Sequence, residues 1–168
     1  MELYGGNLEM IQMQGMQVPV EFSSFGNSSG HQMKVAPLQT KKDQDDAQDV
    51  AEKFCKTYYD TIQKKPHLVS QLYLETSVLI WDGNPLLGQD QIQKCFEQLP
   101  SLTFNVMTMD SHPINPLAVG PRKTFIIKTA GVYRVSGPGS QKQFSQDIVL
   151  TTEGDKWRIA SDTFRTVH

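Results

Sequence analysis

The side chains best suited to acid–base chemistry in this chain are carboxylates, a histidine and tyrosines, namely Asp110, His112, Asp147, Tyr58 and Tyr59. General acid–base catalysis needs a carboxylate or histidine of tuned pKa beside a hydrogen-bond donor, enclosed in a deep cavity. Asp110 and His112 precede a proline at the expected end of a strand, where a turn explains them. The two tyrosines occupy ordinary helix positions. No acid–base pair is placed by spacing, so we expect no enzyme activity.

The cysteines offer no alternative chemistry. Cys55 and Cys95 are too few for a disulfide framework, and no Cys/His spacing suggests zinc. Each lies beside a phenylalanine in a predicted helix, which is typical of a small buried thiol. We therefore expect neither a metal nor a cofactor.

Charge and hydropathy exclude two classes of partner. The chain has 16 basic and 18 acidic residues, and residues 46–168 carry thirteen of each sign. A nucleic-acid binder normally has a basic excess, because phosphate neutralisation supplies much of its affinity. No apolar run approaches the length of a bilayer span, and the N-terminus resembles no targeting leader. We expect a soluble intracellular protein with no direct nucleic-acid or membrane contact.

The chain divides into two kinds of sequence. Residues 1–45 hold five of the seven methionines, with much Gly, Gln and Ser, and show no lasting periodicity. This composition predicts a disordered tail. Residues 46–168 carry regular apolar patterns and predict one domain.

The domain opens with helices. Aspartates crowd the start of the first helix at residues 43–49, and Lys64 and Lys65 end it before Pro66, as the helix dipole favours. Its apolar stripe has i, i+4 spacing. A shorter helix is expected over residues 66–73, and a third over residues 89–99.

Strands dominate the rest. The β-branched and aromatic run 77–81 is followed by Asp82-Gly83, a strong signal for a tight hairpin. Four further strands are expected, at residues 102–111, 122–135, 141–152 and 156–164. Helices followed by an antiparallel meander indicate an α+β domain with its helices on one sheet face.

Alternation predicts which side chains are buried. In the strand 123–135, the residues with the parity of Phe125 and Ile127 form the better core face. The last strand is apolar on both parities, with Ile159 on one and Phe164 on the other. Such a strand is expected to be covered on both sides, in one case by another protein.

These elements and several short motifs resemble the nuclear transport factor 2 family. The motifs are Ala51-Glu52-Lys53-Phe54, Tyr58-Tyr59, Leu72-Tyr73-Leu74, Leu79-Ile80-Trp81-Asp82-Gly83-Asn84, Phe96-Glu97-Gln98-Leu99-Pro100-Ser101, Phe144-Ser145-Gln146, Trp157-Arg158-Ile159-Ala160-Ser161-Asp162 and Phe164-Arg165. The resemblance covers residues 46–166 and rests on the order and spacing of the motifs together. It implies a cone-shaped fold, in which a bent antiparallel sheet is closed by N-terminal helices. Within the family, the chain looks most like the small subunit of the messenger-RNA export receptor heterodimer.

The resemblance also implies a partner and a place of action. Such subunits are not enzymes; they pair through the open sheet face with the matching domain of the large export receptor. The large subunit makes most contacts to the Phe-Gly repeats of the nuclear pore, and the pair shuttles between nucleus and cytoplasm. Arg165 matches an arginine that forms an ion pair with an aspartate of the large subunit. A guanidinium fits a carboxylate through two parallel hydrogen bonds, which gives orientation as well as attraction.

Alternation extends this partner-binding site. Thr163 and Ser161 share the parity of Arg165 and are expected to face the partner, whereas Phe164 and Ala160 are expected to point inward. On the neighbouring outward face we expect Lys128, Ala130 and Val132. The alternative for Arg165 is an ion pair within the chain, to Asp162 or Asp147.

Two other functions remain open at this point. The homodimeric family member that carries Ran-GDP needs acidic side chains on the loop that corresponds to residues 135–140, where this chain has Ser136-Gly137-Pro138-Gly139-Ser140. Asp82 matches one acidic position of that surface, but hairpin turn chemistry explains it equally well. The other possibility is a dimerisation module of a different assembly.

Overall fold

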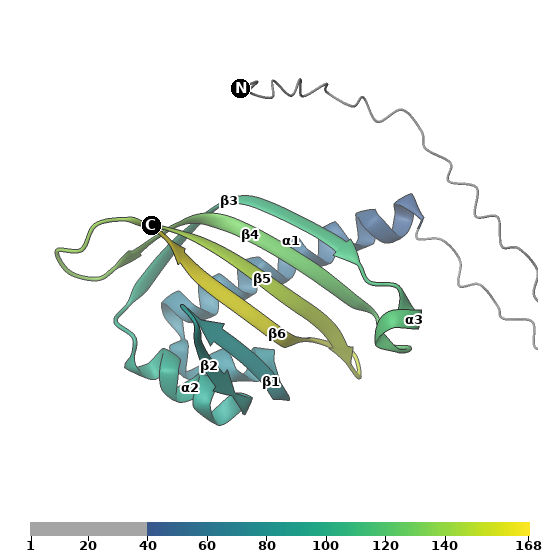
Figure 1. Ribbon diagram of the computed structural model, residues 1–168, viewed down its shortest axis with the longest axis horizontal. Helices are drawn as coiled ribbons and strands as arrows, with labels where there is room; N and C mark the ends of the chain where they lie inside the picture. The colour runs from purple at the N-terminus through teal and green to yellow at the C-terminus, as the bar shows by residue number, and fades with distance from the viewer. Residues whose placement is uncertain (1–39) are drawn as a thin grey trace, which may run out of the picture. The chain divides into compact units, whose positions relative to one another are not determined.

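The computed structural model describes residues 40–168 (Figure 1). Residues 1–39 of the expected tail lie outside the described part of the chain. The remaining chain forms three α-helices, one 3-10 helix and a sheet of six strands.

The first helix, α1 (Lys41–Lys64), begins at a side-chain cap. The Thr40 hydroxyl accepts a hydrogen bond from the Asp43 backbone N–H, and the Asp43 carboxylate accepts one from the Thr40 N–H at 2.8 Å. This reciprocal capping box satisfies two backbone donors at the helix start. Because of it, α1 begins five residues before the domain start expected at residue 46. One side of the helix is buried through Ala47, Ala51, Phe54, Cys55, Tyr58, Tyr59 and Ile62.

A compact second segment follows α1. It comprises the 3-10 helix η1 (Pro66–Leu72), strands β1 (Tyr73–Trp81) and β2 (Asn84–Leu87), and helix α2 (Gly88–Gln98). The β1–β2 hairpin turns at Asp82 and Gly83, whose φ angles are 47° and 87°. Two consecutive residues of positive φ are what a tight two-residue hairpin requires, so the predicted turn is confirmed.

The sheet is completed by four long strands, β3 (Leu102–Pro113), β4 (Thr124–Val135), β5 (Lys142–Glu153) and β6 (Lys156–Val167), with the short helix α3 (Pro116–Val119) between β3 and β4. The strand order is β2-β1-β6-β5-β4-β3. The last four strands form the expected antiparallel meander. One pairing differs from the expectation: β6 lies beside β1 in parallel, so the C-terminal strand is inside the sheet.

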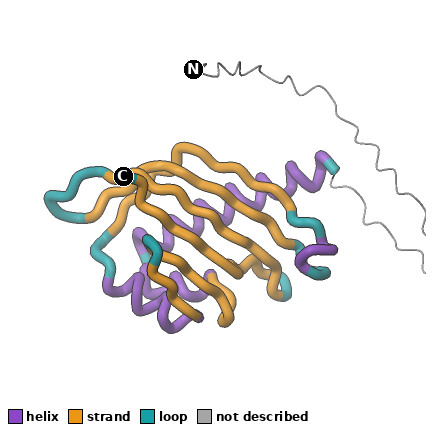
Figure 2. Tube along the Cα trace, in the orientation of Figure 1, coloured by secondary structure: helices purple, strands orange, loops and turns teal. Residues whose placement is uncertain are grey.

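The two faces of the bent sheet differ (Figures 1 and 2). Helix α1 lies behind β3–β6, and no described helix covers the front of these strands. Buried and more exposed residues alternate along β4, with Ile127 buried and Lys128 exposed, which confirms the predicted inward parity. The inward side chains join α1 and α2 in one core cluster. We call the other side of β3–β6 the open face.

A β-bulge removes the basis of one expectation for the last strand. Leu150 pairs with Ile159 and Val149 pairs with Ser161, so Ala160 is an extra residue in β6. The extra residue shifts the alternation by one position. Ile159 and Phe164 therefore both enter the core, at 0% and 1% exposure, despite their different parities. The bulge therefore accounts for the two apolar parities, which give no evidence for or against a second covered face. Ala160, which was expected to point inward, is only partly buried.

Candidate partner-binding face

The structure brings all six predicted partner-binding residues to the open face. Lys128, Ala130 and Val132 come from β4, and Ser161, Thr163 and Arg165 come from β6. Strand β5 lies between them and completes continuous rows across the sheet. One row is Lys128, Asp147, Thr163; the next is Ala130, Ser145, Arg165. Cross-strand neighbours of this kind have Cβ atoms about 5 Å apart, so the rows form one surface.

Arg165 is a cation of this surface that lacks an ion pair. Lys128 Nζ lies 3.4 Å from Asp147 Oδ1, so the neighbouring lysine has a partner. Arg165 is exposed and makes no ion pair among residues 40–168. The two intramolecular alternatives fail for geometric reasons, because Asp162 points into the core and Asp147 pairs with Lys128.

The position of Arg165 is set by the β1–β2 turn. The Asp82 carboxylate accepts hydrogen bonds from the Thr166 N–H at 2.6 Å and from the Thr166 hydroxyl at 2.8 Å. The Asp82 N–H donates to the Phe164 carbonyl at 2.9 Å. Turn and strand are thus joined on both sides of Arg165. A Cβ added to Gly83 would lie 3.6 Å from Arg165 Nη1, so the guanidinium lies against the turn.

A polar cluster lies on the inner side of the same strand. Asp162 is fully buried, and its carboxylate accepts hydrogen bonds from the hydroxyls of Tyr73 (2.6 Å) and Tyr58 (2.9 Å) and from Gln146 Nε2 (2.8 Å). Burial raises the pKa of Asp162 to about 6, although these three hydrogen bonds favour its charged form. The cluster joins α1, β1, β5 and β6 at the centre of the core.

The pattern of residue types did not predict this cluster. Asp162 has the parity of Phe164, so alternation alone places it inside. A carboxylate is rarely buried without a charged partner, which argues against that assignment unless its donors are known. Those donors come from α1, β1 and β5, and only the tertiary structure brings them together.

The acid–base candidates divide between the two faces of the sheet. Asp110, His112 and Asp147 are exposed, whereas Tyr58 and Tyr59 are buried in the core. Burial raises the pKa of the Tyr58 hydroxyl well above its ordinary value. The buried hydroxyls therefore act as hydrogen-bond donors within the core and not beside the exposed carboxylates.

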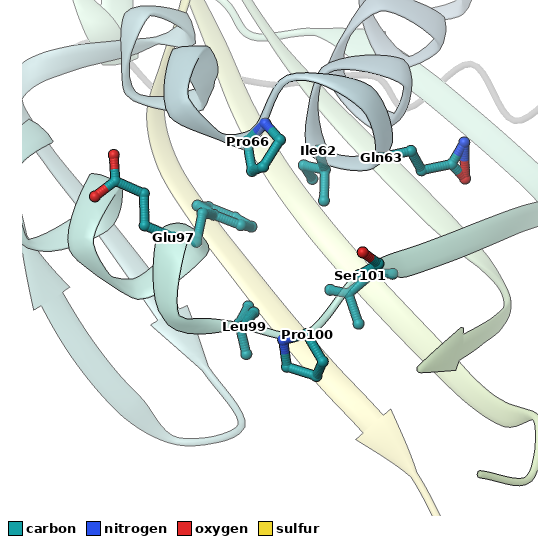
Figure 3. Close-up of a pocket in the computed structure, with 9 residues that line it drawn as sticks. Ile62, Gln63, Pro66, Glu97, Leu99, Pro100 and Ser101 are labelled. Carbon is teal, nitrogen blue, oxygen red and sulfur yellow. The ribbon is translucent and has the colours of Figure 1, made fainter. Parts of the chain in front are cut away.

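A pocket between the end of α1 and the end of α2 is small. It has a volume of about 60 Å³, and Pro66, Leu99 and Pro100 lie around it (Figure 3). Ligand sites usually occupy about 300 Å³ or more. Glu97 is the one ionisable residue in its lining, so this pocket has no acid–base pair.

Residues 40–168 contain neither a cluster of metal-ligating side chains nor a helix able to span a membrane. No three His, Cys, Asp or Glu side chains of residues 40–168 gather in a way that would hold a metal ion. None of the described helices combines the length and the hydropathy needed to cross a bilayer.

Comparison with known proteins supports the resemblance. The model of the nuclear transport factor 2 (NTF2) domain matches residues 50–166. NTF2-related export protein 1 from Bos taurus is 35% identical over 119 residues, which cover 68% of this chain and 84% of that protein. Nuclear transport factor 2 from Cryptosporidium parvum superposes with a TM-score of 0.64 at 26% identity, covering 71% of this chain and 94% of that one.

A further structural neighbour is a chain of the C. albicans Mtr2–Mex67 M domain complex. Its TM-score is 0.57 at 16% identity, with 71% of this chain and 94% of that chain covered. At this identity the likeness concerns the fold alone. The domain match and the export-protein relative go further: the chain belongs to the nuclear transport factor 2 domain family.

Proposed function

We propose that this chain is a non-catalytic subunit that heterodimerises with the large subunit of a messenger-RNA export receptor and supports export through the nuclear pore. The observation that carries the proposal is Arg165, an exposed guanidinium without an ion pair in residues 40–168, positioned on a sheet face that no described helix covers. The family relative named as an export protein supports the same assignment.

The proposed mechanism is completion of the partner's domain. Two open sheet faces pack against each other, exclude water from their apolar rows, and are oriented by a small number of charge pairs. An arginine–carboxylate pair at such an interface gains strength as water is excluded. Thr163, Ser161, Lys128, Ala130 and Val132 belong to the proposed contact surface with Arg165.

The remaining parts of the proposal concern cargo and location. The nearly neutral charge balance favours contact with messenger RNA through the partner rather than directly. Contact with Phe-Gly repeats is likewise assigned to the large subunit. Passage through the pore with that subunit implies that the chain shuttles between nucleus and cytoplasm.

The homodimeric Ran-GDP carrier is less well supported. The loop between β4 and β5 has no carboxylate from Ser136 to Ser140. Asp82, the matching acidic residue, uses both carboxylate oxygens for Thr166. An acidic side chain already engaged within its own chain is poorly suited to bind a GTPase.

The test is the mass in solution of the chain alone and mixed with the matching domain of the large export receptor from the same organism. Native mass spectrometry and light scattering are expected to show a one-to-one complex. A stable homodimer that ignores the receptor domain would refute the heterodimer and favour the carrier or another dimerisation module.

A further inference from the structure

The open face contains a hollow beside Arg165. It has a volume of about 340 Å³, and its lining includes Met107, Ala130, Val132, Ser145 and Val167. We call it the Met107 hollow. Ala130 and Ser145 are opposite each other on β4 and β5, and their small side chains make a low floor. Larger side chains on the flanking strands make the walls.

A second β-bulge builds one wall. Val106 pairs with Gly131 and Thr108 with Ala130, so Met107 is an extra residue in β3. Its side chain is 70% exposed. The opposite wall is Val167, 44% exposed, at the end of β6. Exposed large apolar side chains around a concavity mark an interaction site more often than a monomer surface.

Charge distinguishes the two ends of this site. Ser145, on the floor, pairs across the sheet with Arg165. Strands lie about 4.8 Å apart, so the middle of the hollow and the base of Arg165 are separated by roughly 5–10 Å. The lining of the hollow contains no charged side chain. The site is therefore apolar at one end and has an unneutralised positive charge at the other.

We infer that the Met107 hollow receives one large apolar side chain of the partner's sheet face, which also presents a carboxylate to Arg165. This inference rests on the proposed heterodimer and specifies its chemistry. The partner surface then carries a Leu, Met or aromatic side chain and an Asp or Glu roughly 10 Å apart, the spacing of two strands. A central apolar anchor in a pocket beside a desolvated charge pair is the usual form of an interface hot spot.

A second copy of this chain fits the site less well. The face has two carboxylates near the hollow, Asp110 and Asp147, and both lie beside Lys128 in the cross-strand pairing. Asp147 already forms an ion pair with Lys128. A second copy would therefore offer Arg165 only carboxylates that already share Lys128, whereas a different partner can supply one that shares no lysine.

The test replaces a small residue on the floor of the hollow by a large one, so that the hollow is filled. Ala130→Phe places a ring in the hollow, and Met107→Ala removes a wall at an exposed position where the fold is not at risk. Ala118→Phe on α3 is the control for the same change of side chain, because Ala118 is exposed and lies in the β3–β4 connection, away from the hollow. Affinity for the large receptor domain is measured by calorimetry, and the melting temperature of each free variant is recorded.

The expected result is a loss of affinity of about tenfold or more for Ala130→Phe and about fivefold for Met107→Ala, with Ala118→Phe unchanged. If both hollow variants bind like the unmodified chain while Arg165→Asp does not, the hollow is unoccupied and this inference is wrong, although the proposed function stands. If the unmodified chain does not bind the receptor domain, the proposed function fails and this inference with it. A self-association that Ala130→Phe abolishes would assign the hollow to a second copy and overturn the inference.

Discussion

Asp162 and Arg165 lie three positions apart on β6 and have opposite surroundings. Asp162 is fully buried on the helix side of the sheet, where Tyr58, Tyr73 and Gln146 supply its hydrogen bonds. Arg165 is exposed on the open face and forms no ion pair within the described chain. One strand thus carries a buried carboxylate with internal hydrogen-bond partners and an exposed guanidinium with no ion pair in the described chain.

The difference follows from the cost of leaving polar groups unsatisfied. Inside the core an unpaired carboxylate would be very unfavourable, so the fold supplies every donor itself. On the open face water solvates the guanidinium, and no internal partner is needed. An exposed arginine held in place without a counter-charge is therefore available to a partner, whereas the buried cluster serves the fold alone.

The largest expected effect comes from reversing the charge on the open face. Arg165→Asp should reduce affinity for the large receptor domain by about 100-fold or more, since disrupting an interfacial charge pair costs roughly 2–5 kcal/mol. The melting temperature of the free domain should stay unchanged, because Arg165 is exposed. Calorimetric titration measures the first and thermal unfolding the second. Arg122→Asp, another exposed arginine, is the control; equal binding by both variants would remove Arg165 from the interface.

Asp162→Asn tests how the buried carboxyl on the inner face contributes to stability. The pKa of Asp162 rises from an ordinary 3.8 to about 6 on folding, so between these values the folded state holds more protons than the unfolded state. Its stabilising contribution is complete below about pH 4 and is lost as the pH rises through about 6. The asparagine variant should lack this loss, which amounts to roughly 3 kcal/mol.

Chemical unfolding of both proteins between pH 4 and 7 measures this difference. Asp155→Asn, at an exposed turn, provides the control. Parallel stability curves for the unmodified chain and Asp162→Asn would show that the buried carboxyl does not titrate in this range. Binding to the receptor domain at pH 7 should be unaffected by the substitution, because Asp162 faces away from the open face.

Asp82 connects the two faces and should affect both. Asp82→Ala removes two hydrogen bonds to Thr166 and places alanine at a φ of 47°, for a combined loss of stability of roughly 2 kcal/mol. It should also weaken receptor binding severalfold by releasing the strand around Arg165. Asp82→Asn tolerates the positive φ and keeps an acceptor, so it should recover most of both losses. An alanine variant with normal stability and affinity would show that the hydrogen bonds between Asp82 and Thr166 neither stabilise the fold nor position Arg165.

The smallest effect is expected at the start of the domain, where we propose that residues 40–168 suffice for folding and pairing. A chain that begins at residue 39 retains Thr40 and should match the full chain in both properties. A chain that begins at residue 46 loses the capping box and the first turn of α1, and its free energy of unfolding should fall by about 1–2 kcal/mol. Equal stability of the two truncations would support the domain start predicted at residue 46.

Much of the fold was predictable from local patterns. Aspartates at one end, lysines at the other and an i, i+4 stripe predicted α1, and Asp82-Gly83 predicted the hairpin turn. Alternation along β4 separated Ile127 from Lys128 correctly. The six partner-binding residues were placed on one face from alternation and resemblance, and their role in binding stays a prediction.

What the sequence by itself determined is the set of helices and strands, their order and the inward parity of a regular strand, because capping, turn propensity and alternation depend on near neighbours. Only the tertiary structure decided the bulges at Met107 and Ala160, the parallel pairing of β6 with β1 and the burial of Asp162. Tyr58 and Asp162 are 104 positions apart, and Asp82 and Thr166 are 84 apart. Their contacts depend on strand register, and an extra residue in one strand reverses the faces of all that follow.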